Sequence, residues 1–159
     1  MRVINIIGTY ECKVDAKGRL MLPTALKKQL APELEGGFVL KRSMFEKCIE
    51  IYPMTEWNDK MSKVNRLNRF VRKNVEFIRL FTAGVKIVEL DVTGRLLIPK
   101  DLMGFGSIDN DIVLASAGTY VEIWDKDAYE NKLSNPETDI ATLAEEVMGS
   151  LNDGADDLP

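Results

Sequence analysis

The chain has 159 residues, a formal net charge of −4, two cysteines and no histidine. Its length allows one domain, or two small domains that share a core. The missing histidine and the lack of a close cysteine pair exclude a zinc finger and any mechanism that needs a histidine base. No apolar run approaches the ~20 residues that span a bilayer, and we expect no signal peptide, so the sequence predicts a cytoplasmic protein.

The first element in the chain is a strand–turn–strand unit. Residues 10–14 alternate between apolar and polar side chains, which is the period of a half-buried strand. Residues 20–22 form a short apolar run that indicates a second strand. Between them, Asp15 can accept hydrogen bonds from the backbone two residues on, and Gly18 tolerates a positive φ. Pro23 lacks a backbone donor, so it ends the second strand and suits the first turn of a helix.

This unit recurs 76 positions later in the chain. The stretch DAKGRLMLP (15–23) returns as DVTGRLLIP (91–99), which makes an internal repeat the main feature of the sequence. Turn geometry explains the aspartate and the glycine, but not why an arginine, Arg19 or Arg95, follows in both copies. For one copy alone, a solvent-exposed Asp–Arg pair would be a sufficient explanation. The recurrence favours a binding role, because a guanidinium suits phosphate groups and guanine edges.

The remaining elements follow from periodicity and from turn residues. In chain order we expect a helix at 24–30, a loop at 31–37, strands at 38–41 and 48–52, a helical segment at 55–81 with a break near 65–68, a second hairpin and helix at 84–103, strands at 112–115 and 120–124, and helices at 126–133 and 136–148. Cys12 and Cys48 lie on two of these strands, where we expect both thiols to be buried and reduced.

Charge is distributed unevenly along the chain. Residues 1–80 hold 16 Lys and Arg against 9 Asp and Glu, a balance of +7, whereas residues 81–159 hold 5 against 16, a balance of −11. Such asymmetry indicates a basic working surface and an acidic remainder. Many of the basic residues lie in the helical segment 55–81, where a charge run is usually a solvated face and attraction of DNA would be a secondary role.

Two further motifs accompany the repeats: YPMTEW (52–57) follows the first, and EIWD (122–125) follows the second. Together with the doubled D-x-x-G-R-x-x-x-P turn, they carry a resemblance that runs from about residue 8 to residue 129. The doubled turn resembles the AbrB/SpoVT swapped-hairpin DNA-binding domains. Two copies in a chain of this length resemble the MraZ family of bacterial transcriptional regulators.

The repeat also sets the expected fold. One β-hairpin is marginal alone in water, so each copy needs a partner to bury its apolar face. We expect an α+β fold, mainly β, in which two tandem AbrB-like repeats interleave as an intramolecular pseudo-dimer. The resemblance implies a double-psi or swapped-hairpin β-barrel with flanking helices. The predicted divisions are 7–54, a DNA-contacting first repeat; 55–82, a helical connector; 83–126, a second repeat; and 127–159, a C-terminal helical segment with an acidic tail.

The family resemblance implies a function for these turns. It implies a sequence-specific DNA-binding regulator of the division and cell-wall gene cluster, including its own promoter, that binds repeated upstream sites on double-stranded DNA as a ring-like homo-oligomer. Such a protein would be nucleoid-associated and would need no cofactor, metal, membrane or small-molecule substrate. The residues expected to contact DNA are Arg19 and Lys17, followed by Arg2 and Arg95.

The two arginines are expected to contribute unequally. Their turns share one geometry, so only the surroundings can separate them. We expect Arg19→Ala to weaken DNA binding far more than Arg95→Ala, because the neighbours predicted for Arg19 are basic (Lys13, Lys17, Lys27 and Lys28) and those predicted for Arg95 are acidic (Asp91 and Asp101).

Two other functional classes are weighed against this hypothesis. An antitoxin-like or other protein-interaction module could use the same fold, with acidic residues 134–159 covering a partner, although the duplication argues against it. An enzyme is not expected, because no nucleophile–base pair, metal-ligand cluster or phosphate-cradling glycine loop is present. Asp15 and Asp91 are the only repeated carboxylates, and each already has a role in its turn.

Overall fold

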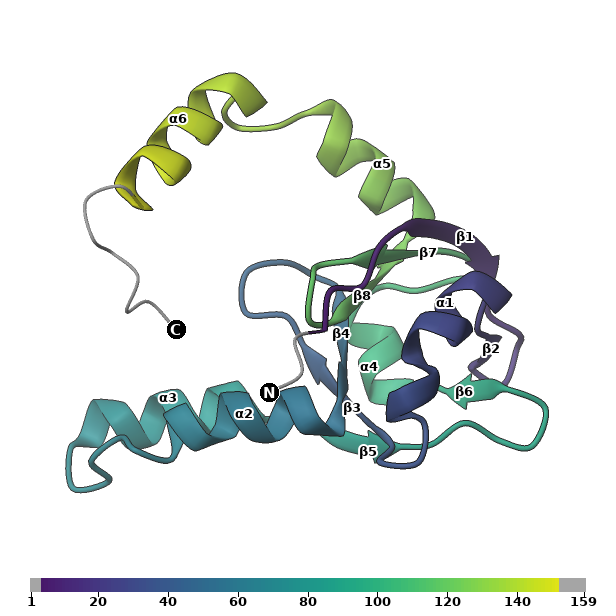
Figure 1. Ribbon diagram of the computed structural model, residues 1–159, viewed down its shortest axis with the longest axis horizontal. Coiled ribbons are helices and arrows are strands. Elements are labelled where there is room, and N and C mark those ends of the chain that lie inside the picture. The colour runs from purple at the N-terminus through teal and green to yellow at the C-terminus, as the bar shows by residue number, and fades with distance from the viewer. Residues whose placement is uncertain (1–3, 152–159) are drawn as a thin grey trace. The chain divides into compact units, whose positions relative to one another are not determined.

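The computed structural model describes residues 4–151 and has an α+β fold, as predicted (Figure 1). Arg2, one of the residues expected to contact DNA, lies outside the described residues. The first repeat contains β1 (Thr9–Lys13), β2 (Arg19–Met21), α1 (Thr24–Leu30), the 3-10 turn η1 (Ala31–Glu33), β3 (Phe38–Arg42) and β4 (Ile49–Pro53). The second contains β5 (Lys86–Val88), β6 (Arg95–Leu97), α4 (Lys100–Phe105), β7 (Asp111–Ser116) and β8 (Val121–Asp125).

The strands of the two repeats interleave. Six strands form one antiparallel sheet in the order β1-β7-β8-β4-β3-β5, and β2 pairs with β6 in a separate two-stranded ribbon. The first strand of each repeat therefore pairs with the third strand of the other, β1 with β7 and β5 with β3. This exchange confirms the intramolecular pseudo-dimer. The described strands do not close into a barrel.

Because of this exchange, the strands on either side of the first turn do not pair with each other as a hairpin. Residues 10–14 and 20–22 lie on either side of the predicted turn, but only one isolated bridge, Val14 to Leu20, joins them. Their ladders go instead to strands of the other repeat, β7 and β6. Each repeat thus depends on the other for its backbone pairing as well as for its core.

The core lies between the six-stranded sheet on one side and the ribbon, α1 and α4 on the other (Figure 1). Alternation along the strands decides which side chains enter it. In β2 and β6 the middle residues, Leu20 and Leu96, are opposite one another and fully buried, whereas their neighbours face outward. This apolar contact holds the ribbon to the rest of the fold.

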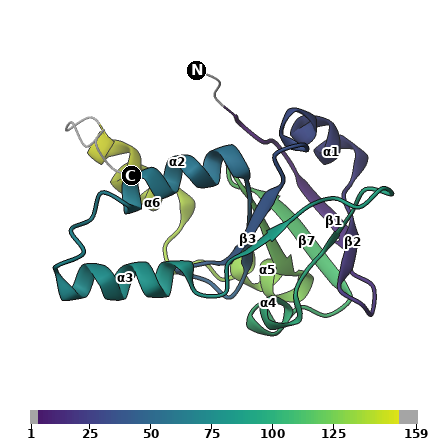
Figure 2. The same cartoon turned by 90° about the horizontal axis from the view of Figure 1, so that it is seen from below.

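The helical connector is an arm of two antiparallel helices, α2 (Met54–Val64) and α3 (Arg72–Thr82), joined by residues 65–71 (Figures 1 and 2). The predicted break is confirmed. Asn68 contributes to it, because its side-chain oxygen accepts a hydrogen bond from the Phe70 N–H at 2.9 Å. At the base of the arm, the ring of Trp57 stacks on Phe81 with centroids 6.0 Å apart.

Ionisable side chains that the sequence did not single out lie beneath this arm. Lys41 on β3 is only 2% exposed, and its Nζ lies 4.4 Å from the centroid of the Phe81 ring. Opposite it on β4, Glu50 accepts a hydrogen bond from the Tyr52 hydroxyl at 2.9 Å, and burial raises the pKa of its carboxyl. The sheet face that carries the arm is thus partly polar, and a cation–π contact helps to fix α3.

The described residues 127–151 belong to a second compact unit. Helix α5 (Lys126–Ser134) begins where the sequence predicted, but α6 (Ile140–Leu151) begins later than residue 136. The reason is local, since the Asp139 carboxylate accepts a hydrogen bond from the Thr142 N–H at 2.8 Å and so marks the start of the helix. Among the described residues, no helix is long and apolar enough to cross a membrane.

Both cysteines are free thiols, with Cys48 buried and Cys12 partly buried. Burial raises the pKa of Cys12 to about 11 and that of Cys48 to about 12, so both stay protonated near neutral pH. Because the thiolate is the nucleophile, we expect the native protein to react slowly with iodoacetamide at pH 8, more slowly at Cys48 than at Cys12. Mass spectrometry over time checks this order, with the urea-unfolded chain as the control. Rapid modification of native Cys48 would contradict it.

Candidate functional site

The first turn holds its arginine in a fixed direction. The Oδ1 atom of Asp15 accepts hydrogen bonds from the N–H groups of Lys17 and Arg19, both at 2.9 Å. Its Oδ2 atom accepts one from Nε of Arg19 at 2.8 Å. Gly18 completes the turn at φ 87°. Among the contacts of residues 4–151, Arg19 uses Nε only, so its terminal nitrogens remain available to a ligand.

The second turn repeats this arrangement with one addition. Asp91 accepts hydrogen bonds from the N–H groups of Thr93 and Arg95 at 2.9 Å, and from Nε of Arg95 at 3.1 Å. The Thr93 hydroxyl, at the position of Lys17 in the first turn, donates to Asp91 at 2.7 Å and accepts from Nε of Arg95 at 2.9 Å. Arg95 is therefore held by two side chains, whereas Arg19 is held by one.

The ribbon brings both arginines to one face. In its register Arg19 lies opposite Leu97, and Met21 lies opposite Arg95. Because Leu20 and Leu96 point inward, these four side chains share the outer face. Arg19 and Arg95 occupy diagonal positions, for which residues in an antiparallel pair lie about 7–8 Å apart and their Cβ atoms somewhat closer. Met21 and Leu97 are each about half exposed beside them, at 51% and 54%.

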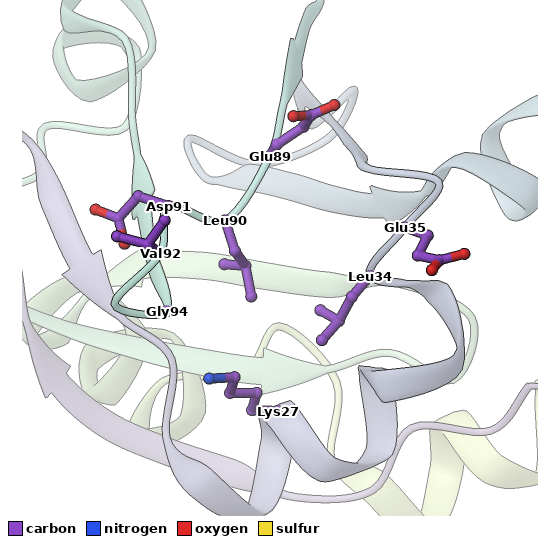
Figure 3. A pocket seen from close by; sticks show the side chains of 8 residues that line it. All are labelled: Lys27, Leu34, Glu35, Glu89, Leu90, Asp91, Val92 and Gly94. Atoms are coloured by element: carbon purple, nitrogen blue, oxygen red, sulfur yellow. The ribbon is translucent and has the colours of Figure 1, made fainter.

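Lys27, which the sequence predicted beside Arg19, lies at the second turn instead. Lys27 extends from α1 toward the second turn, where a methyl group added at Gly94 would come within 2.9 Å of its Nζ (Figure 3). It lines a hollow of about 370 Å³ with Leu34, Glu35, Glu89, Leu90, Asp91, Val92 and Gly94. Correspondingly, Met103 of α4 lies against Gly18 of the first turn. The exchange of strands is the reason, because it places each helix on the turn of the other repeat.

The structure thus brings together Arg19 and Arg95, with Lys17 exposed at the first turn. The sequence missed the outward side chains of Met21 and Leu97. A signal was available, because Arg-Leu-Met and Arg-Leu-Leu each put the outer residues of a three-residue strand on one face. Within residues 4–151, no cluster of acidic and cysteine side chains is placed to hold a metal ion.

The two turn carboxylates predict an acid dependence of stability. Hydrogen bonds from the backbone N–H of Arg19, and in the second turn from that of Arg95, lower the pKa of Asp15 and of Asp91. A carboxyl with a lowered pKa stabilises the fold above its unfolded value of about 3.9, and this contribution is lost as the pH falls through the folded value. We expect the double variant Asp15→Asn/Asp91→Asn to lose less stability than wild type between pH 5 and pH 2.

Thermal unfolding at a series of pH values measures this slope. Asp101→Asn is the matched control, because Asp101 is exposed and makes no side-chain hydrogen bond or ion pair in the described part of the chain. Equal slopes for wild type and the double variant would show that the turns do not depend on charged carboxylates.

Two strand–turn–strand units exchange strands here, and their arginines lie on the same face of one ribbon. This arrangement defines a tandem swapped-hairpin protein. The family model described as "MraZ protein, putative antitoxin-like" matches residues 6–78 and again residues 81–150. The chain belongs to the MraZ family.

Curated relatives agree over nearly the whole chain. A protein of Christiangramia forsetii is 65% identical over 148 residues, which is 93% of this chain and 96% of the relative. One of Flavobacterium psychrophilum is 64% identical over 149 residues, 94% and 95% of the two chains. A more distant one of Bifidobacterium longum is 32% identical over 143 residues, 90% and 92%. Each is named transcriptional regulator MraZ, so the family is one of regulators of transcription and not of enzymes.

Proposed function

We propose that this chain regulates transcription by binding double-stranded DNA through the outer face of its β2–β6 ribbon. The observation that carries the proposal is the placement of Arg19 and Arg95 on that face, each held at Nε by its own aspartate. A two-stranded ribbon fits the major groove of B-DNA. The contact takes one strand from each repeat, so it is not confined to residues 7–54.

Each outward side chain has a chemistry that suits this groove. The terminal nitrogens of Arg19 and Arg95 can donate two hydrogen bonds to the O6 and N7 atoms of guanine, or to a phosphate. Lys17 supplies a point charge to the backbone, and Arg2 is proposed to do the same. Met21 and Leu97 are apolar surfaces that can contact thymine methyl groups.

A ribbon of two three-residue strands makes few contacts, so we propose that affinity comes from linked copies. A ring-like homo-oligomer would bind repeated sites upstream of the division and cell-wall gene cluster, including its own promoter, at high effective concentration. This protein would be cytoplasmic and associated with the nucleoid. The names of the relatives as transcriptional regulators support the role in transcription within this proposal.

A second candidate is a protein-interaction role of the antitoxin type. It is favoured by the wording of the family description and by the acidic composition of residues 134–159. In that case the acidic segment, and not the ribbon, would carry the binding. Loss of function on removal of residues 134–159, with unchanged DNA binding, would distinguish it.

The test of the main proposal is a gel shift on the DNA upstream of the protein's own gene, against scrambled DNA of equal length, over a series of salt concentrations. We expect tighter binding to the upstream DNA, and a fall in affinity on both DNAs as salt rises, because phosphate contacts release counterions. Equal affinity for the two DNAs would refute sequence-specific binding. No binding at low salt would refute the proposal entirely.

A further inference from the structure

The arm presents apolar side chains that nothing in the described structure covers. Its inner faces pack together through Val64, Ile78 and Phe81. On the outside, Phe70 at the far end is fully exposed and Leu80 on α3 is 69% exposed, with Phe77 one helical turn away and also exposed. Exposed large apolar side chains that adjoin on one helix face, as Phe77 and Leu80 do, are typical of an interaction surface.

The arm that carries these side chains is strongly basic. Residues 54–82 contain seven Lys and Arg against three Asp and Glu. Arg79 pairs with Glu76 at 2.7 Å on α3 itself. Five other cations form no ion pair within residues 4–151: Lys63, Arg66, Arg69, Arg72 and Lys73. A partner for the arm should therefore be both apolar and acidic.

Within residues 4–151, one helix is both apolar on its exposed side and acidic. None of the residues of α6 is buried, and its exposed apolar side chains recur at spacings of three and four, namely Ile140, Leu143, Val147, Met148 and Leu151. Glu145 and Glu146 are exposed on the same helix, and residues 133–159 contain seven acidic residues and no basic one. A helix of 12 residues is marginal in water without a surface to pack on.

We propose that α6 of one copy docks its apolar face on the α2–α3 arm of a second copy. The exposed side chains of α3 and α6 would bury one another, and the unpaired cations of the arm would face Glu145 and Glu146. This inference rests on the homo-oligomer of the proposed function but not on DNA binding. It names the contact that links the copies, and it can be tested without DNA.

Photo-crosslinking of the full-length protein tests the contact directly. A photoreactive residue replaces Leu80, and unlabelled and ¹⁵N-labelled chains are mixed, allowed to exchange and irradiated. We expect crosslinks from the arm to residues 140–151, with mixed-isotope and single-isotope pairs in equal numbers. Crosslinks confined to a single isotope would place α6 on the arm of its own chain and overturn the proposal, as would crosslinks to a surface other than α6. Val92, exposed in the second turn, is the control position and should give no crosslink to α6.

Charge exchange tests the same contact without a probe. Arg72→Glu/Lys73→Glu and Glu145→Lys/Glu146→Lys each change exposed residues, so both variants should fold, which circular dichroism verifies. We expect each to lower the mass of the assembly in light scattering, and the four changes together to restore part of it. Lys28→Glu reverses one exposed charge on α1 and should leave the mass unchanged. A mass unaffected by either double variant would overturn the proposal.

Discussion

Replacing Arg19 with alanine is expected to weaken DNA binding at the specific site, and replacing Arg95 is expected to weaken it by a smaller amount. If the guanidinium contacts a guanine edge, each lost contact should cost ~1–3 kcal/mol on the specific site only. If it contacts a phosphate, the salt slope should fall by ~1 per engaged subunit, and affinity should fall on all sequences alike. Several ribbons binding together would multiply either effect.

There is a structural reason to expect a larger loss of DNA affinity in Arg19→Ala than in Arg95→Ala. Arg95 is held at Nε by both Asp91 and Thr93, so its guanidinium is less free to meet a ligand. At the position of Thr93 the first turn has Lys17, which adds a cation beside Arg19. Lys27 at the second turn acts in the opposite direction, so the difference should be smaller than the sequence predicts.

The measurement is a salt titration of binding to operator and random DNA for wild type, Arg19→Ala and Arg95→Ala, with the mass of the assembly verified for each. Arg19→Lys keeps the charge but loses the planar donor fork, so it separates a phosphate contact from a guanine contact. Lys86→Ala removes one exposed cation from β5, away from the ribbon, and should have little effect. Equal losses at the two arginines would refute the expected order. Full affinity in both alanine variants, with the assembly intact, would refute the ribbon as the DNA contact.

The local parts of this fold could be predicted from sequence because short-range rules decide them. The Asp15 turn, the glycine with positive φ and the proline before α1 each depend on neighbours a few residues away. The second copy of the motif supplied an independent check on each of them. The break in the arm followed from length, because a helical segment over residues 55–81 is long for a globular helix.

The parts that could not be predicted depend on long-range pairing. Lys27 follows the first turn in sequence but lies against the second, because β2 pairs with β6 and each helix follows its strand across. The common outer face of Arg19 and Arg95 has the same origin. In the sequence, Lys41 is one more charged residue at the end of a strand. Its burial could not be predicted, because it depends on the arm folding over β3.

The largest effect on folding is expected when the repeats are separated. A fragment of residues 1–54 keeps β1 and β2 but loses β7 and β6, the strands with which they pair. Leu20, fully buried in the intact chain, would lose Leu96 opposite it. We expect no folded monomer of this fragment at any concentration, because two of its four strands would have no ladder and its core would be open.

A homodimer is the one folded state that the geometry allows this fragment. Two copies could repeat the observed exchange, with β1 on β3 of the partner and β2 on β2. Pairing of β4 with β4 would then place two Glu50 side chains opposite one another, as Glu50 and Glu122 are in the intact chain. Two carboxylates opposite one another repel, so this dimer should be weaker at neutral pH than at a pH low enough to protonate them.

Light scattering and circular dichroism over a range of concentrations measure this equilibrium. Residues 4–126, which hold both repeats, are the control and should unfold at a temperature that does not depend on concentration, since their strand exchange is intramolecular. A fragment of residues 1–54 that stays folded and monomeric on dilution would contradict the exchange, because β1 and β2 would then need ladder partners that the first repeat does not contain.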